Sequence, residues 1–402
     1  MPTWEISPCA NSGIGYSGTA SSYPSMGGTC LAGGNENRHQ VKAPTAYTWA
    51  NLYVRCTAWA TSDQTIRSRL NSGFGALIVT ITGTGVFEDT TNSDAVASGD
   101  LINFEAKRAL AGTSTLTIGG STLQTSNNNT TFECTADVNG PPAIGFGLTV
   151  FGSLTGQTQR IDLVTTETDV QYTVREPTTY SNSRIFLHSN GLDGATLWRF
   201  RVDLANGAQS ISIGAGSTGA FEDTTNSDDV VAGSEVDYQL DTTASTTSSC
   251  ATASTQVTHT SPGRTMGSGR ANPSSQTGDF YRGAESNGDT TATESDVQIA
   301  ARAAFTAKNL MVNAKTHGAG ATDIFLRRNT ANSALTVNIP SSSTGIFEDT
   351  TNQVSIVVGD LYNYFRDGAG EGITMAIVGM QQGPDDAIFD LPQGKLNVLL
   401  RM

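Results

Sequence analysis

The chain has 402 residues, of which 37% are hydrophobic and 15% are charged, and its net charge is −14. This composition is too apolar and too weakly charged for an intrinsically disordered chain, and its negative field repels phosphate backbones, so we expect no nucleic-acid partner. No stretch approaches the ~20 apolar residues that span a membrane, and residues 1–5 have neither a basic nor an apolar segment, so we expect no signal peptide.

Short runs of alternating or β-rich residues follow one another along the whole chain and predict strands. In 197–202, for example, the alternation places Trp198, Phe200 and Val202 on one face and Arg199 and Arg201 on the other. Only a short stretch such as 302–308 is a candidate for a helical turn. The predicted strands are 52–55, 65–70, 76–81, 101–106, 114–118, 183–187, 197–202, 210–213, 236–240, 310–312, 324–327, 334–339 and 361–365.

One six-residue phrase, Phe-Glu-Asp-Thr-Thr-Asn, occurs three times, at 87–92, 221–226 and 347–352. The offsets of 134 and 126 residues are close to the length of a domain and far above the period of a solenoid. Turn signals at Pro141-Pro142 and at 261–263 separate the copies. We therefore predict an all-β chain of three tandem β-sandwich, jelly-roll-like domains of about 130 residues, at 1–140, 141–262 and 263–402. Parallel βαβ units are excluded because crossover helices are missing.

Within the phrase, the aromatic residue is expected to anchor the core, and Asp-Thr-Thr-Asn is expected to form the turn that leaves the strand. The residues that this structural interpretation singles out are Phe87, Asp89, Asn92, Phe221, Asp223, Asn226, Phe347, Asp349 and Asn352.

The alternative interpretation of the phrase is a cation site. Glu88, Asp89, Asn92 and Asp94 all carry oxygen atoms of the kind that calcium accepts. Against this reading, Val354 replaces Asp94 in the third copy, and no copy has the ligand spacing of a known calcium loop.

Arginines also recur in the strand that precedes each phrase. We expect them to pair with Glu88, Glu222 and Glu348 across a sheet. These arginines are Arg67, Arg69, Arg199, Arg201, Arg327 and Arg328.

Signals of catalysis are missing from the sequence. The four histidines occupy different places in the repeat, and there is no nucleophile elbow, His-Glu-x-x-His or phosphate-binding loop. The five cysteines are odd in number and do not recur between copies, so we expect buried thiols, with Cys9 and Cys30 left open as a pair. The sequence predicts no catalytic residue, no cofactor and no enzyme.

The pattern from Gly85 through the phrase to Gly99-Asp100, with its two later counterparts, resembles repeat-containing structural proteins of tailed bacteriophages. The resemblance implies a virion protein, such as a capsid decoration, head fibre or tail accessory, present in many copies. It implies other virion proteins as partners, a homo-oligomer with a trimer as one form, and folding in the host cytoplasm.

Two alternatives remain open from the sequence. A receptor- or glycan-binding surface module would display aromatic platforms, for which Tyr47, Trp49 and Tyr180 are the candidates, although a core role is also expected for them. An enzyme such as a depolymerase is the third reading.

Overall fold

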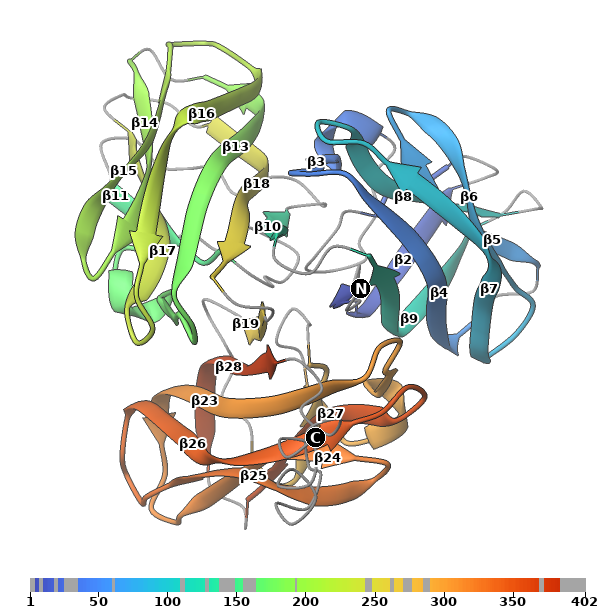
Figure 1. Cartoon of the computed structure of the whole chain (residues 1–402), viewed down its shortest axis with the longest axis vertical. Helices are drawn as coiled ribbons and strands as arrows, with labels where there is room; N and C mark the ends of the chain where they lie inside the picture. Colours follow the sequence, from blue (N-terminus) through green and yellow to red (C-terminus); the bar gives the residue numbers. More distant parts are fainter. Residues whose placement is uncertain are drawn as a thin grey trace, which may run out of the picture.

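A computed structural model describes residues 4–6, 10–17, 21–24, 35–59, 62–108, 113–126, 130–136, 149–154, 164–191, 194–242, 248–260, 264–269, 277–284, 290–368 and 372–383. These residues form three lobes arranged around a common centre (Figure 1). Each lobe consists of two antiparallel sheets with a hydrophobic core between them. We call them lobe 1 (4–126), lobe 2 (130–260) and lobe 3 (264–383).

The first sheet of each lobe contains the strand that carries the recurring phrase. In lobe 1 its strands are, in spatial order, β2 (Ala10–Ser17), β9 (Thr113–Thr125), β4 (Tyr47–Ala58) and β7 (Gly85–Val96), with β1 (Trp4–Ile6) also on β9. In lobe 2 they are β10 (Thr130–Ala136), β18 (Ser248–His259), β13 (Thr178–Asn190) and β16 (Gly219–Val230). In lobe 3 they are β19 (Arg264–Gly269), β28 (Ile373–Gly383), β23 (Phe305–His317) and β26 (Gly345–Ile356).

The second sheet covers the other side of each core. In lobe 1 it contains β3 (Val41–Lys42), β8 (Leu101–Arg108), β5 (Gln64–Leu70) and β6 (Gly73–Ile81). In lobe 2 it contains β11 (Thr149–Gly152) and β12 (Tyr172–Thr173), both on β17 (Glu235–Thr242), then β14 (Thr196–Val202) and β15 (Ala205–Ile213). In lobe 3 it contains β21 (Thr290–Thr291), β20 (Phe280–Arg282) and β22 (Ile299–Ala300), then β27 (Leu361–Asp367), β24 (Thr322–Arg328) and β25 (Ala331–Ile339).

The order of the strands is that of a jelly roll. We number the eight main strands of a lobe from 1 to 8 along the chain. The spatial order of the strands is then 1-8-3-6 in the sheet that carries the phrase and 2-7-4-5 in the other sheet. The predicted all-β, jelly-roll-like class is therefore confirmed. Among the described residues the helical elements are three 3₁₀ turns, η1 (Glu36–Arg38), η2 (Glu167–Asp169) and η3 (Glu294–Asp296), and none is long and apolar enough to cross a membrane.

Two local predictions differ from the structure. Strand β10 lies within the predicted domain 1–140 but pairs with β18, so lobe 2 begins before the Pro141-Pro142 signal, which follows its first strand instead of preceding it. The stretch 302–308, a candidate for a helical turn, enters strand β23 at Phe305, and Phe305 and Ala307 belong to the core of lobe 3.

The cores contain the large aromatic side chains that alternate along the strands. Trp198 and Phe200 are buried as their alternation predicts. Tyr47, Trp49 and Tyr180 are buried too, so the core role holds for them and they form no exposed platform. Cys56 is a buried free thiol, whereas Cys9 and Cys30 lie outside the described residues.

The aromatic residue of the phrase packs at the edge of the core instead of its centre. Phe87, Phe221 and Phe347 are each half-buried against the core cluster of their own lobe. The fully buried residue of the phrase is its aspartate: Asp89, Asp223 and Asp349 are all buried.

The phrase also lies inside a strand and does not leave it, which corrects the predicted turn. In lobe 1, Ser93 pairs with Ala50 and Asp89 with Leu52, so three residues of β7 face the single residue Asn51 of β4. The same bulge occurs in β16 and β26. In all three lobes the facing asparagine has a positive φ of 50–54°, which asparagine tolerates better than most residues. The facing residues are Asn51, Asn182 and Asn309.

The buried aspartate binds two backbone amides of the bulge and one backbone amide of the second sheet. In lobe 2, the carboxylate of Asp223 accepts hydrogen bonds from the backbone amides of Thr225 (3.1 Å), Asn226 (3.1 Å) and Ser210 (2.8 Å). Asp89 and Asp349 make the same contacts in lobes 1 and 3. Burial by itself raises the pKa of these carboxyls, but the hydrogen bonds outweigh it and hold each pKa at about 2.

We expect Asp223→Ala to destabilise lobe 2 by about 2–4 kcal/mol, because three backbone amides lose a charged acceptor. Hydrogen exchange of the lobe 2 amides in the full chain measures the loss of stability. Asp229→Ala is the matched control, since Asp229 is exposed on the same strand and its carboxylate accepts a hydrogen bond from the Thr179 hydroxyl. Because the folded pKa of Asp223 is depressed, its contribution is present above pH 4 and falls as the pH drops toward 2. Equal exchange in the two variants would contradict this role.

A carboxyl with no exposed surface, that of Asp237, occurs in lobe 2. Asp237 is fully buried on β17 at the position that Asn103 and Asn363 occupy in the other lobes. Burial, and next the nearby negative charge of Glu167, raise the pKa of Asp237 from 3.8 to about 9, with Arg201 opposing them. Asp237 is therefore protonated at neutral pH and resembles the amide of the other lobes in charge and shape.

The stability that the neutral Asp237 carboxyl supports is fully present below about pH 4 and is lost as the pH rises through about 9. Asp237→Asn is expected to remove this loss of stability at high pH. Asn363→Asp is expected to introduce the same loss in lobe 3. Calorimetric melting of the full chain from pH 5 to pH 9.5 measures both. Identical pH profiles for the wild type and Asp237→Asn would show that the carboxyl is not neutral in the folded state.

Candidate functional site: the contacts between lobes

The glutamate of the recurring phrase reaches the neighbouring lobe in all three copies. Glu222 of lobe 2 binds Lys42 of lobe 1 at 2.7 Å. Glu348 of lobe 3 binds Arg175 of lobe 2 at 2.5 Å, and Glu88 of lobe 1 binds Arg302 of lobe 3 at 2.5 Å. The three ion pairs therefore link lobe 1 to lobe 2, lobe 2 to lobe 3 and lobe 3 back to lobe 1.

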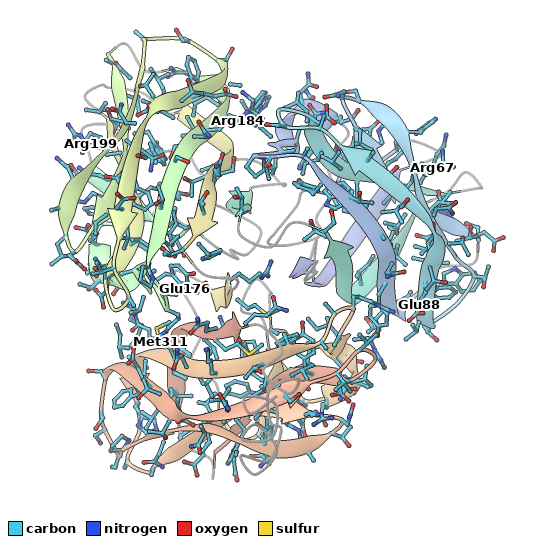
Figure 2. The ribbon with its side chains drawn as sticks, viewed as in Figure 1. Arg67, Glu88, Glu176, Arg184, Arg199 and Met311 are labelled. Carbon is cyan, nitrogen blue, oxygen red and sulfur yellow. The ribbon has the colours of Figure 1, made fainter. Side chains whose placement is uncertain are left out.

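The alternation of side chains along the strand explains why the glutamate faces outward. Neighbouring residues in a strand point to opposite faces of the sheet, so the aspartate that is drawn into the core leaves the preceding glutamate on the outer face. Figure 2 shows the consequence, with Glu88 at the side of lobe 1 that approaches lobe 3. One phrase thus supplies a contact inside each lobe and a contact between lobes.

The cations come from the connection that enters the third strand of the neighbouring lobe. Arg175 and Arg302 each lie three residues before the start of β13 and β23. The residue at that position in lobe 1 is Pro44, and Lys42, two residues earlier on β3, makes the contact instead. A head-to-tail contact of this kind generates a ring when its rotation closes, as it does here after three lobes (Figure 1).

The predicted pairing of the strand arginines with these glutamates is wrong. Arg69, Arg201 and Arg327 each bind a glutamate of the 3₁₀ turn in their own lobe through two nitrogens. The partners are Glu36, Glu167 and Glu294. The fork of a guanidinium matches a carboxylate at this turn, and the pairs are largely shielded from solvent.

These glutamates were missed at the sequence level, although a signal exists. Each lies four residues before a recurring glutamine, as in Glu167 and Gln171. The spacing is the same in all three copies, the other glutamines being Gln40 and Gln298.

A second position contributes to every inter-lobe contact, with different chemistry each time. It is the seventh residue of β4, β13 and β23, which is Tyr53, Arg184 and Met311. The Arg302 guanidinium lies 4.6 Å from the Tyr53 ring centroid. Arg184 donates to the Gln40 carbonyl of lobe 1 at 2.9 Å, and Met311 packs into the hydrophobic core of lobe 2 (Figure 2).

The contact between lobes 2 and 3 contains further polar pairs. Lys315 of lobe 3 donates to the Thr168 carbonyl at 2.6 Å and pairs with Asp169. Glu176 of lobe 2 accepts from Gln381 of lobe 3 at 3.2 Å and lies 3.0 Å from the Nδ1 atom of His259. Glu176 and His259 are both buried, so this contact is shielded from solvent.

The four residues of the alternative cation site are divided among separate partners. Asp89 and Asn92 bind each other, with the Asn92 amide donating to the carboxylate at 2.9 Å. Asp94 accepts from the backbone amide of Ala76 at 2.6 Å, and Glu88 binds Arg302. Within the described ranges, no three His, Cys, Asp or Glu side chains gather as a metal-binding group.

Comparison with known proteins gives little similarity. No protein-family model matches the chain, and no curated protein matches it. Among solved structures the chain is similar to one described as "The Triple Jelly Roll Fold and Turret Assembly in an Archaeal Virus", with 11% identity, a TM-score of 0.23 and coverage of 95% of this chain and 91% of that chain. The identity and TM-score are too low to transfer a function. The jelly-roll assignment rests on strand order and register.

The Arg175–Glu348 pair can be tested by a double-mutant cycle with Arg175→Ala, Glu348→Ala and the double variant. The Arg175 side chain is 5% exposed and that of Glu348 33% exposed, so we expect a coupling of about 1–2 kcal/mol, below that of a fully buried pair. Thermal unfolding measures the coupling, and small-angle scattering reports whether lobes 2 and 3 separate in the single variants. The Arg199–Asp241 pair within lobe 2 is the control, because its loss should leave the scattering unchanged.

Proposed function

We propose that the chain is a non-enzymatic structural protein of a virus particle, in which one chain supplies a pre-assembled three-lobed block. The observation that carries this proposal is the closed ring of head-to-tail contacts built on the glutamates of the recurring phrase. Three separate jelly-roll subunits with the same contact would form a trimer. Joining them in one chain removes the concentration dependence of that assembly.

The chemistry of the recurring phrase supports a structural role. Its aspartate binds the amides of a strand bulge, and its glutamate forms an ion pair with the next lobe. Both acidic residues of the phrase therefore make structural contacts. The net charge of −14 favours solubility at the high local concentration of a component made in many copies. The resemblance of the phrase to structural proteins of tailed bacteriophages supports the same class of function.

The block is proposed to decorate a capsid, form part of a head fibre or serve as a tail accessory, at a site of threefold or sixfold symmetry. Its partners would be other virion proteins and further copies of itself, and it would fold in the host cytoplasm. Three lobes with the same fold and different surface residues offer similar but unequal faces. Each lobe can therefore meet a different neighbour while the block keeps an approximate threefold shape.

Quantitative mass spectrometry of purified particles of the encoding virus tests the proposal. We expect the chain in many copies per particle, and mild protease treatment of intact particles is expected to remove it if it decorates the surface. An internal capsid protein in the same sample is the control for particle integrity. Finding the chain in infected-cell lysate and not in particles would contradict the virion assignment.

A further inference from the structure

The contact between lobes 1 and 2 forms a cavity of about 200 Å³ that is partly open to solvent. It is lined by the β3–β4 connection and the turn after β7 on the lobe 1 side, and by β13, β16 and β18 on the lobe 2 side. Pro44 forms part of this lining at the position where lobes 2 and 3 carry the arginine of the inter-lobe ion pair. The loss of that arginine from lobe 1 therefore coincides with an open space at the same contact.

The charges around the cavity are unusual for this chain. Lys42 and Arg184 contribute two positive charges and Glu222 one negative charge, so the lining is net positive within a chain of net charge −14. Glu222 lies 2.7 Å from Lys42 and 3.3 Å from the Nε atom of Arg184, which holds both cations at the cavity wall. The Lys42 side chain is 41% exposed, whereas the Arg184 side chain is 6% exposed and also donates to the Gln40 carbonyl. Lys42 is therefore the cation that a ligand can reach.

The remaining lining is rich in neutral hydrogen-bonding groups. Hydroxyls come from Thr224 and Ser98 on opposite sides of the contact, with further hydroxyl and amide side chains from β13 and β18. Such groups pair with the hydroxyls of a sugar, while Pro44 offers an apolar surface to one ring face. The volume is below the roughly 300–1,000 Å³ of pockets for drug-sized ligands, which limits the occupant to about one monosaccharide.

We propose that this cavity binds a single acidic sugar, with the sugar carboxylate on Lys42 and the sugar hydroxyls on the surrounding serine and threonine side chains. The Lys42 ammonium group selects the carboxylate, because a charged hydrogen bond is stronger than a neutral one. The hydroxyl groups distinguish a sugar acid from a simple anion. This inference concerns the chain alone and does not require its presence in a virion.

Ligand-observed NMR titration of the full chain tests the site, with N-acetylneuraminic acid and glucuronic acid as probes. Glucose is the uncharged control, and inorganic phosphate is the anion without sugar hydroxyls. We expect at least one of the two acids to bind, and both glucose and phosphate to bind at least tenfold more weakly. Failure of both acids to bind overturns the proposal, and so does phosphate or glucose binding as tightly as the acids.

Variants then locate the site. Lys42→Met keeps an unbranched side chain that is one atom shorter and removes the charge. It is expected to weaken acid binding at least tenfold, whereas Lys42→Arg is expected to retain binding. Thr224→Val is expected to weaken binding about threefold, as for loss of one neutral hydrogen bond. Lys107→Met is the matched control, because Lys107 is an exposed lysine of lobe 1 that does not line the cavity. Wild-type affinity in Lys42→Met, with a normal circular dichroism spectrum, would overturn the assignment.

Discussion

The buried aspartate of the recurring phrase is the constraint on which the rest of the structure depends. In each lobe it enters the core and binds the amides that a strand bulge releases. Because adjacent residues alternate between faces, the glutamate before it is directed outward, where it meets a cation of the next lobe. The burial of the aspartate against the backbone amides thereby sets the position of the glutamate that forms the inter-lobe ion pair.

Covalent joining of the lobes permits differences that a homotrimer excludes. Tyr53, Arg184 and Met311 occupy one structural position yet contribute an aromatic ring, a charge and an apolar side chain to their respective contacts. Each of these contacts is complementary to a different partner surface, so the chemistry favours one cyclic order of lobes over others. A further asymmetry is that lobe 1 has Pro44 where lobes 2 and 3 have Arg175 and Arg302. Pro44 lines the cavity between lobes 1 and 2.

The fold class could be predicted from sequence because alternating runs such as 197–202 and the repeated phrase carry strong local signals. The bulge could not be predicted, because Asp-Thr-Thr-Asn is also suitable for a turn, and only the facing strand with its left-handed asparagine distinguishes the two. The residues that pair between lobes could not be predicted from the sequence for a similar reason. Glu222 meets Lys42 across 180 residues, and nothing local relates them. The half-buried position of Phe221 likewise depends on the edge of a core that only the tertiary structure defines.

The ring closes at the contact between lobes 3 and 1, which are not consecutive in the chain, so this contact tests the central claim most directly. Carbodiimide treatment joins a lysine to a carboxylate only when the two touch, and Arg302→Lys would place a lysine beside Glu88. We expect peptide mapping of the monomeric product to show position 302 joined to Glu88 within one chain. Coupling of Lys42 to Glu222 in the same sample is the internal control. Absence of the 302–88 product while the control forms, or its formation only between chains, would contradict the closed ring.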